Sequence, residues 1–520
     1  MRSGSAFTGL PTRATHAPCH QREPGVAPAA NAGLLVALLM LFTVLFPSRR
    51  TGALLVSAFA LLSSPLAAQA IRTGTVAERY AQLCASCHGA ELQGGQAPSR
   101  LDDVWVSGGD DESLARSIRN GFPEKGMPAW SAALPEKEIR AMVIFMLEKR
   151  AQARREQTQF VKPAESIAVQ SELHAYKLDT WVGDLVEPWG LAFLPGNRAL
   201  VTEKKGNLYL VENGRRAATP IKGVPEVDID GQAGLFDVVP HPDHARNGWI
   251  YFAYSDPQKD ADGKPVSLTR IIRGKLRDGA LVDQETIFQG PLQYYRPDGG
   301  VHFGGRIAFD KKGYLYFTIG ERGDGRNAQD LARPTGKVHR VFDDGRIPED
   351  NPFAKRTGVD RTIWSYGHRN PQGLAFDPVS GNLFDAEHGP RGGDELNLVQ
   401  PGRNYGWPII TYGMNYDGTA MVDITAKDGM EQPVTYWVPS LAVCGINFYT
   451  GDLFPKWKNQ LFLASLAAEE LRRIEIKDGK VLKQETLFKN LGRIRYVIGG
   501  PDGALYVLLP TRIARISPAG

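Results

Sequence analysis

The chain has 520 residues, of which 42% are hydrophobic and 23% are charged, so its composition is that of an ordinary globular protein with room for at least two cores. The formal net charge of +4 is small for this length, which excludes a general electrostatic affinity for nucleic acid or for an anionic membrane surface. We therefore expect a small-molecule or protein partner and no nucleic acid.

Residues 1–70 are predicted to be an export segment. They contain two apolar runs, Leu34–Phe46 and Leu54–Leu66, each shorter than the roughly 20 residues that a membrane-spanning helix needs. With translation starting at Met40, the second run becomes the apolar region of a signal peptide that ends at the small residues of 68–70. An uncleaved amino-terminal membrane anchor is the alternative. Both interpretations put the catalytic part outside the cytoplasm, so we expect a periplasmic protein.

Residues 71–150 are predicted to form a small all-α cytochrome c domain. The string Cys84-Ala-Ser-Cys87-His88 supplies two thiols that bond a porphyrin and an imidazole that binds the iron of haem c. A redox dithiol or half of a zinc site would need a thioredoxin-like pattern or further Cys and His residues nearby, and this segment has neither. The second axial ligand is predicted at Met127, in a loop bounded by Pro128.

A helix is predicted over Glu136–Lys149, where apolar residues recur at helical spacing. Met142 and Met146 lie on its apolar face and are expected to pack in the core. Residues 151–172 carry mixed charge and little apolar content, so we expect an exposed linker. Because His/Met ligation leaves no open position on the iron, this domain can only transfer electrons, and the chemistry must lie further along the chain.

From residue 173 to residue 520, a unit of apolar strand, turn and apolar strand recurs. Each unit is a hairpin whose apolar faces cannot be buried alone, and radial stacking around a channel buries them without leaving long free edges. The recurrence predicts an all-β six-bladed β-propeller, with a β-sandwich as the alternative. The copies begin at Trp189, Gly234, Arg306, Gln372, Ile446 and Tyr496.

Polar strings interrupt this pattern in the loops between the predicted blades, where propeller sites collect. Two or three arginines with amides suit a planar polyanionic ligand, because the guanidinium group binds carboxylates through two parallel hydrogen bonds. His368 and His388 are interpreted as supporting or packing groups. The strings are Gly231-Gln232, His302-Phe-Gly-Gly-Arg306, His368-Arg369-Asn370, Glu387-His388-Gly389-Pro390 and Arg493-Ile-Arg495.

In this order, and over nearly all of residues 176–520, the strings resemble the soluble aldose sugar dehydrogenases of the glucose/sorbosone type, which use pyrroloquinoline quinone (PQQ). The resemblance implies that His302 is the general base that takes the proton of the anomeric hydroxyl, while a hydride passes to PQQ. A histidine suits this role because its unperturbed pKa lies near working pH. Arg369 would polarise the quinone carbonyl, and Gln232 and Asn370 would bind the cofactor beside it.

The resemblance also implies two calcium ions. The backbone carbonyls of Gly389 and Pro390 match the ligands of a Ca2+ that bridges to the cofactor, as oxygen ligands suit a hard cation. Glu395 and Tyr405 match the ligands of a second, structural Ca2+. An ordinary charged turn is the alternative at this second position.

Arg493 and Arg495 match the pair that holds the PQQ carboxylates. The best-known member of the family would have a cofactor-binding lysine at the position of Ala467, so the pocket is expected to have one cation fewer. Glu321 also differs from the best-known glucose enzyme and fits the broader aldose branch. These departures favour a broad range of aldoses over strict glucose specificity.

We therefore expect a quinoprotein oxidoreductase that oxidises aldoses to lactones and passes the electrons to its own haem c. A downstream periplasmic cytochrome or respiratory oxidase would accept them, and a homodimer is left open. One alternative keeps PQQ with a sorbosone-like or other alcohol or aldehyde substrate. Another is a calcium-dependent lactonase, which would need several acidic side chains around one metal where this sequence offers Arg, Gln and Asn. A third alternative is a propeller that binds a partner without catalysis, which would not explain the strings that contain arginine.

Overall fold

The computed structural model describes residues 74–102, 104–105, 107–157, 162–297 and 300–519. The predicted export segment, with both of its apolar runs, lies outside these residues. Within the described ranges, no helix is both long and apolar enough to cross a membrane.

The described residues from 74 to 157 form the predicted small all-α domain. At the start of its first helix, Thr75 and Glu78 cap each other's backbone N–H groups, and Asp110 accepts a hydrogen bond from the Ser113 N–H at the start of a later helix. The elements are α3 (Val76–Leu83), α4 (Ala85–His88), α5 (Asp111–Asn120), the 3-10 helix η1 (Pro123–Lys125) and α6 (Glu136–Gln157).

Helix α6 begins at the predicted residue but continues past Lys149 to Gln157. The added residues are mainly Ala, Arg, Gln and Glu, which all have high helix propensity, so the helix continues beyond its apolar face. Met142 is buried in the core of this domain, as predicted, while Met146 is partly buried against it. Regular structure thus extends into the segment that the sequence predicted as a linker, and the two-residue strand β1 (Val169–Gln170) also lies there.

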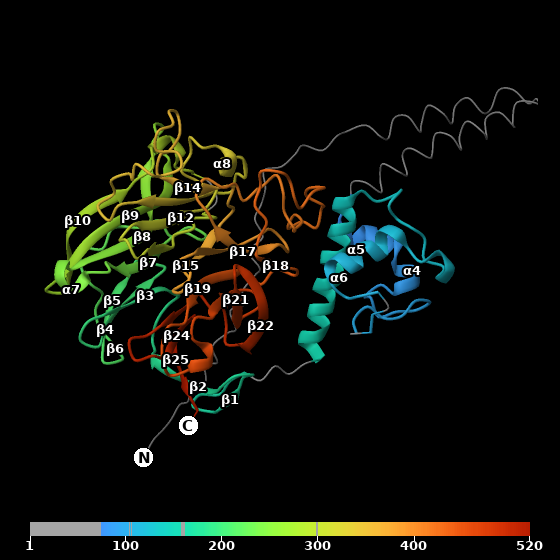
Figure 1. The fold of residues 1–520 in the computed structure, drawn as a ribbon, viewed down its shortest axis with the longest axis horizontal. Coiled ribbons are helices and arrows are strands. Elements are labelled where there is room, and N and C mark those ends of the chain that lie inside the picture. Colours follow the sequence, from blue (N-terminus) through green and yellow to red (C-terminus); the bar gives the residue numbers. More distant parts are fainter. Residues whose placement is uncertain (1–73, 103, 106, 158–161, 298–299, 520) are drawn as a thin grey trace, which may run out of the picture. The chain divides into compact units, whose positions relative to one another are not determined.

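The remaining described residues form a six-bladed β-propeller, which confirms the fold predicted from the repeat (Figure 1). Each copy seen in the sequence provides the first two strands of one antiparallel blade. The first blade consists of β3 (Pro188–Leu194), β4 (Arg198–Glu203), β5 (Leu208–Glu212) and β6 (Arg215–Arg216). The second consists of β7 (Leu235–Pro240), β8 (Trp249–Lys259), β9 (Pro265–Arg277) and β10 (Ala280–Phe288). The third consists of β11 (Ile307–Phe309), β12 (Leu315–Ile319), β13 (Lys337–Val341) and β14 (Ile363–Tyr366).

The other three blades have the same antiparallel order, with one addition. The last blade gains β2 (Ala175–Val182), which pairs with β25, and β1, which pairs with β2. The strands are β15 (Pro371–Phe376), β16 (Leu383–Glu387), β17 (Asp394–Val399) and β18 (Thr435–Trp437); β19 (Val443–Phe448), β20 (Leu461–Ser465), β21 (Glu470–Lys477) and β22 (Lys480–Lys489); and β23 (Tyr496–Gly499), β24 (Leu505–Leu509) and β25 (Arg512–Pro518). Short helices lie in the connections: α7 (His244–Asn247), η2 (Leu292–Tyr294), α8 (Arg326–Gln329) and η3 (Pro455–Trp457).

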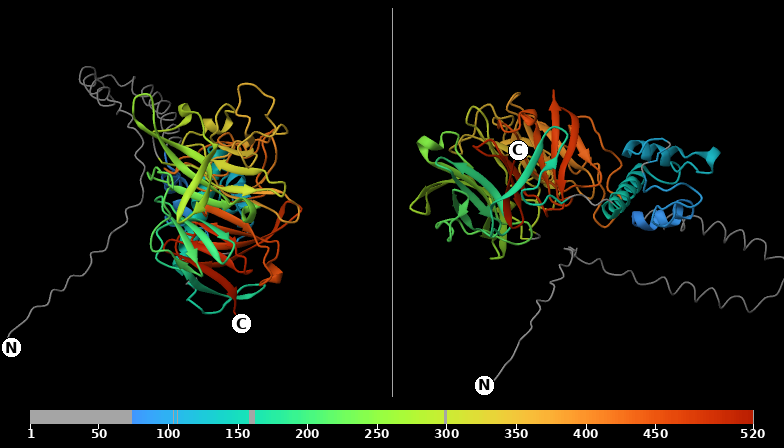
Figure 2. Two further views of the ribbon diagram at one scale, coloured as in Figure 1. Left: turned by 90° about the vertical axis from the view of Figure 1, so that its left-hand side faces the viewer. Right: turned by 90° about the horizontal axis from the view of Figure 1, so that it is seen from below.

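The first strands of the six blades form a closed ring. Strand β3 contacts β7, β7 contacts β11, and the contacts continue through β15, β19 and β23 back to β3. Figure 1 shows the blades arranged around this ring, and the views in Figure 2 show them from the side. Because each blade sends its first strand to the centre, the loops that enter and leave these strands meet around a common axis.

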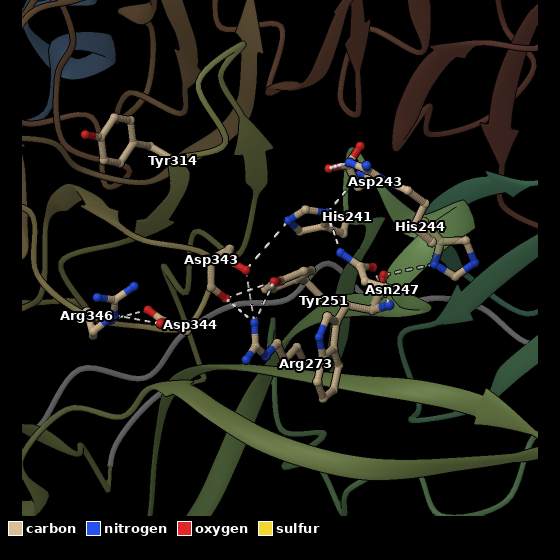
Figure 3. Close-up of polar contacts among 12 residues, drawn as sticks. His241, Asp243, His244, Asn247, Tyr251, Arg273, Tyr314, Asp343, Asp344 and Arg346 are labelled. Atoms are coloured by element: carbon tan, nitrogen blue, oxygen red, sulfur yellow. Dashed lines mark hydrogen bonds and ion pairs between the residues drawn. The ribbon is translucent and has the colours of Figure 1, made fainter.

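A polar junction joins the second blade to the turn after β13 in the third (Figure 3). The Tyr251 hydroxyl donates to the Asp343 carbonyl oxygen at 2.8 Å, and the Arg273 guanidinium donates to the Asp343 carboxylate at 3.2 Å. His241 Nε2 lies 3.7 Å from the same carboxylate. The three side chains all converge on one turn, so we interpret this cluster as a connection between blades.

Candidate active site

His302 lies in the loop before β11, where its backbone adopts a left-handed conformation with φ of 53°. Its backbone N–H donates to Gln232 Oε1 at 2.9 Å, and its Nδ1 lies 2.7 Å from Glu321 Oε1. Glu321 follows β12 and is only 2% exposed. A carboxylate at Nδ1 holds the proton on that nitrogen, which leaves Nε2 as the proton acceptor. Sequence reasoning noted Glu321 but did not predict this pair.

The surroundings of His302 keep its imidazole neutral near pH 7. Burial lowers the pKa of His302 first, and the nearby positive charge of Arg369 lowers it further, against the opposing effect of Glu321. His302 and Arg369 in turn hold the pKa of Glu321 below its ordinary value, although burial alone would raise it. The result is a neutral imidazole beside an ionised carboxylate.

Arg369 and Asn370 lie between β14 and β15 and join several loops. The Arg369 backbone N–H donates to Glu387 Oε2 at 2.6 Å, and its guanidinium donates to the carbonyl oxygens of His388 at 3.0 Å and Gly389 at 2.7 Å. Asn370 Oδ1 accepts from the Gly304 N–H at 3.1 Å. These bonds hold Arg369 close to His302 and to the loop that carries the predicted calcium ligands.

His388 lies among four of the predicted site residues. Burial lowers the pKa of His388 far below its ordinary value, and Arg369, Arg495, His302 and Arg493 all lower it further. The positive charges of its neighbours therefore oppose protonation of this imidazole. The sequence interpretation of His388 as a supporting group missed this central place, because its neighbours come from three separate loops, those before β11, β15 and β23.

Arg493 and Arg495 precede β23. Arg495 donates to Gln372 Oε1 at 2.9 Å and contacts the Cys444 sulfur at 3.5 Å, and its guanidinium lies 5.8 Å from the Trp189 ring centre. Cys444 is buried and in contact with this arginine. Burial and then the charge of Arg495 lower the pKa of Arg493. Two arginines that repel each other at a partly buried site fit an anionic ligand, which would relieve that repulsion.

Arg306 has a different place from the other arginines of the polar strings. It is 1% exposed, lies 3.2 Å from Asp237 Oδ1, and packs between the rings of Trp189 and Tyr496 with centroid distances of 4.1 and 4.0 Å. Its guanidinium also donates to the Gln372 carbonyl oxygen at 2.8 Å. Because these contacts occupy it fully, Arg306 supports the inner ring instead of offering charge to a ligand.

The loop Glu387–Asp394 folds back on itself at Gly389. The Gly389 N–H donates to Asp394 Oδ1 at 2.9 Å, and a Cβ at Gly389 would lie 2.1 Å from the Gly393 carbonyl oxygen, so no side chain fits. Asp394 Oδ2 is bonded to Ser440 Oγ at 2.7 Å. Asp394 therefore holds the loop, while the Gly389 carbonyl oxygen faces Arg369. This carbonyl fits a hard cation by chemistry.

Glu395 and Tyr405, the predicted structural calcium pair, are not joined by any hydrogen bond among the described residues. The Tyr405 hydroxyl donates to the Leu398 carbonyl oxygen at 2.5 Å, and its ring stacks on His368 with centroids 4.6 Å apart. Glu395 Oε2 lies 3.4 Å from Asn397 Nδ2. The two residues instead flank a buried set of acidic groups.

This buried set consists of His368, Asp385 and Glu387, whose ligand atoms all lie within 4.8 Å of one another. His368 Nδ1 is 3.1 Å from Asp385 Oδ2 and 3.2 Å from Glu387 Oε1. Although burial alone would lower it, Asp385 and Glu387 raise the pKa of His368 to about 9, so the imidazole forms ion pairs with these carboxylates. Burial and the neighbouring Glu387 raise the pKa of Glu395 well above its ordinary value. Carboxyl groups that raise one another's pKa at a buried position fit a divalent cation, which would relieve their repulsion. Sequence reasoning missed Asp385, although residues 385 and 387 share one face of a strand.

The haem-binding string lies on the short helix α4, beside the core of the helical domain. Cys84 and Met127 both pack against that core, and the Met127 backbone exchanges two hydrogen bonds with Phe122 at 2.8 and 3.1 Å. Burial lowers the pKa of His88, which favours the neutral imidazole that binds iron, and raises the pKa of Cys84 to about 11. Cys84, Cys87, His88 and Met127 thus fit a covalently bound haem.

These features define a class of protein: a propeller dehydrogenase with a cytochrome c domain on the same chain. The model of the Cytochrome C oxidase, cbb3-type, subunit III family matches residues 72–146. The model of the Glucose / Sorbosone dehydrogenase family matches residues 185–517. The chain therefore belongs to the Glucose / Sorbosone dehydrogenase family, and it is an oxidoreductase.

Individual relatives agree with this family. Aldose sugar dehydrogenase YliI of Escherichia coli is 44% identical over 330 residues, which cover 62% of this chain and 87% of the relative. The crystal structure of the soluble aldose sugar dehydrogenase from Escherichia coli in the apo-form is 41% identical, with a TM-score of 0.61 over 66% of this chain and 99% of that one. The PQQ-bound aldose sugar dehydrogenase from Streptomyces coelicolor is 30% identical, with a TM-score of 0.53 over 66% and 98%.

Proposed function

We propose that this enzyme oxidises aldose sugars at the anomeric carbon to lactones, with PQQ as the first electron acceptor and its own haem c as the second. The observation that carries the proposal is the neutral His302, paired with the ionised Glu321 and placed beside Arg369. The similarity to the aldose sugar dehydrogenase from Streptomyces coelicolor, whose structure contains PQQ, supports the choice of cofactor.

The residues divide the work as follows. When bound, PQQ supplies a two-electron acceptor for the hydride that leaves the anomeric carbon. His302 Nε2 accepts the proton of the anomeric hydroxyl, and Glu321 stabilises the imidazolium that forms. Arg369 supplies positive charge where negative charge develops on the acceptor side. Gln232 and Asn370 hold the loops that carry His302 and Arg369.

The two calcium sites belong to the same proposal. The carbonyl oxygens of Gly389 and Pro390 would bind the ion at the cofactor, and this ion would supply a second positive charge besides that of Arg369. Glu395 and Tyr405 would hold the structural ion together with the acidic groups around Asp385.

Electrons then leave through the haem. Cys84 and Cys87 would hold the porphyrin covalently, and His88 and Met127 would bind the iron. A haem on the same chain makes the first electron acceptor intramolecular. The match of residues 72–146 to a cbb3-type oxidase subunit supports a cytochrome or an oxidase as the next acceptor. We place this exchange in the periplasm.

Sugar-dependent reduction of the haem tests the proposal. The chain is produced in a host that matures haem c, supplied with PQQ and Ca2+, and mixed with a panel of aldoses while the absorbance of reduced haem is followed. Reduction that needs both PQQ and Ca2+ is expected, with lactone as product. If only sorbosone-like aldehydes or other alcohols reduce the haem, the substrate class is wrong. Hydrolysis of lactones without PQQ, and no haem reduction, would favour the lactonase alternative.

A further inference from the structure

Lys204 lies immediately after β4 and is attached to the loop that carries Gln232. Its ammonium donates to the Gly231 carbonyl oxygen at 2.6 Å, and its own carbonyl oxygen accepts the Leu235 N–H at 2.9 Å. Gly234 passes so close that a Cβ there would lie 2.2 Å from the Lys204 carbonyl oxygen. Lys204 is therefore held at the side of the candidate active site by both its backbone and its side chain.

The same ammonium lies near both arginines of the anion-binding pair. Burial lowers the pKa of Lys204 first, and although the exposed carboxylate of Glu187 opposes the change, Arg495 and Arg493 lower it further. The geometry agrees, because Arg495 lies over Trp189 at the start of β3, and Pro188 beside it pairs with Glu203, the residue before Lys204. Closing the propeller ring thus brings the first blade to the last at this point.

The hydrogen bond to Gly231 occupies only one of the donors of the Lys204 ammonium. A carbonyl oxygen is a neutral acceptor, and an ammonium group has three donors, so two remain for other acceptors. No carboxylate is hydrogen-bonded to this ammonium among the contacts of the described residues. Lys204 is thus a half-buried cation that is bonded to a neutral acceptor and lies near two further cations. This arrangement favours binding of an anionic ligand over an ion pair within the protein.

We propose that Lys204 binds a carboxylate of the cofactor, so that Lys204, Arg493 and Arg495 together hold the acidic edge of PQQ. This inference rests on the proposed function, because it takes PQQ, a tricarboxylate, as the ligand. It also gives the pocket a third cation from the first blade, whereas the turn after β20 offers only Ala467.

Direct titration of PQQ into the calcium-loaded, haem-containing protein tests the inference without measuring turnover. Lys204→Gln keeps a donor for Gly231 but removes the charge, and we expect its Kd for PQQ to rise about 10- to 100-fold, as for loss of one charge-assisted hydrogen bond. The dependence of Kd on salt concentration should become weaker in the same variant. Lys204→Arg should bind nearly as tightly as the wild type.

Lys205→Gln is the matched control, because it removes the same charge from the neighbouring, exposed side chain and should leave Kd unchanged. Equal affinity of Lys204→Gln and the wild type would overturn the inference while leaving the proposed function standing. Equal weakening in Lys204→Gln and Lys204→Arg, with a lower melting temperature before PQQ is added, would also overturn it, since Lys204 would then only hold the Gly231 loop. A wild type that does not bind PQQ would remove the proposed function itself.

Discussion

At the scale of single residues, the candidate site depends on how neighbouring charged groups shift one another's pKa values. His302 is neutral because it is partly buried and lies near Arg369, and it is oriented because Glu321 lies 2.7 Å from Nδ1. His388 remains neutral for a related reason, since burial lowers its pKa first and the positive charges of Arg369, Arg495 and Arg493 lower it further. The chemistry of the site thus follows from which side chains are buried together.

Replacing His302 with alanine should lower kcat for sugar oxidation by about 10²- to 10⁴-fold, the usual contribution of a general base. The haem spectrum should not change, because the base and the haem-binding residues lie in different domains. Sugar-dependent haem reduction in the PQQ-loaded protein measures both. His244→Gln, a change in the remote helix α7, serves as the control. Full turnover in His302→Ala would exclude His302 as the base.

The pH dependence of kcat/KM should reflect the lowered pKa of His302. A base acts when it is unprotonated, so activity should persist below pH 6.5, the ordinary pKa of histidine, and fall only as the pH drops through the lowered value. Glu321→Gln removes a group that raises this pKa, so the acidic limb should move to still lower pH and kcat should fall. An acidic limb that does not move would show that His302 does not titrate in the reaction.

At the scale of elements, short loops at the ends of regular structure carry the functional groups. Met127 is held by its backbone pairing with Phe122, just after η1, whereas Met142 lies inside α6 with 1% exposure. We expect different roles for the two methionines, because one lies in a loop whose backbone is fixed and the other faces a packed core.

Met127→Ala should change the spectrum of the haem and open its iron to external ligands such as cyanide, because the sixth ligand is lost. Met142→Leu conserves volume in the core and should keep the wild-type spectrum. Absorption spectra with and without cyanide measure the difference. An unchanged spectrum in Met127→Ala would point to another axial ligand.

At the scale of the whole molecule, the propeller is closed by strand β2 from the beginning of the domain, which pairs with the carboxyl-terminal strand β25. Tyr176 and Leu178 of β2 lie in one buried cluster with Trp457 and Ile516. Closure therefore combines backbone pairing with a shared core, and it ties the beginning of the domain to its carboxyl-terminal strand.

Leu178→Ala should lower the free energy of unfolding by about 2–5 kcal/mol, because it leaves a cavity in a packed cluster. Lys177→Ala in the same strand should cost at most about 1 kcal/mol, since its pair with Asp179 is at the surface. Thermal or denaturant unfolding of both variants measures the difference. Equal stability of the two would show that β2 does not contribute to the closed ring.

The sequence by itself determined the features that depend on local spacing. Strand and turn periodicity predicted the six blades, and the haem-binding string at Cys84–His88 predicted the cytochrome c domain. It also indicated His302 and Arg369 as candidate site residues, because they belong to polar strings that interrupt an apolar repeat in the loops between blades. The end of α6 was predicted too early, since helix propensity extended it beyond its apolar face.

Only the tertiary structure decided which of these groups meet. The pairing of His302 with Glu321, the place of His388 and the approach of Lys204 to Arg495 all join residues from different strands or blades. No periodicity in the chain encodes such contacts, because they arise when six blades close into one ring. The sequence therefore determined the elements and the candidate groups, and ring closure determined their charges and partners.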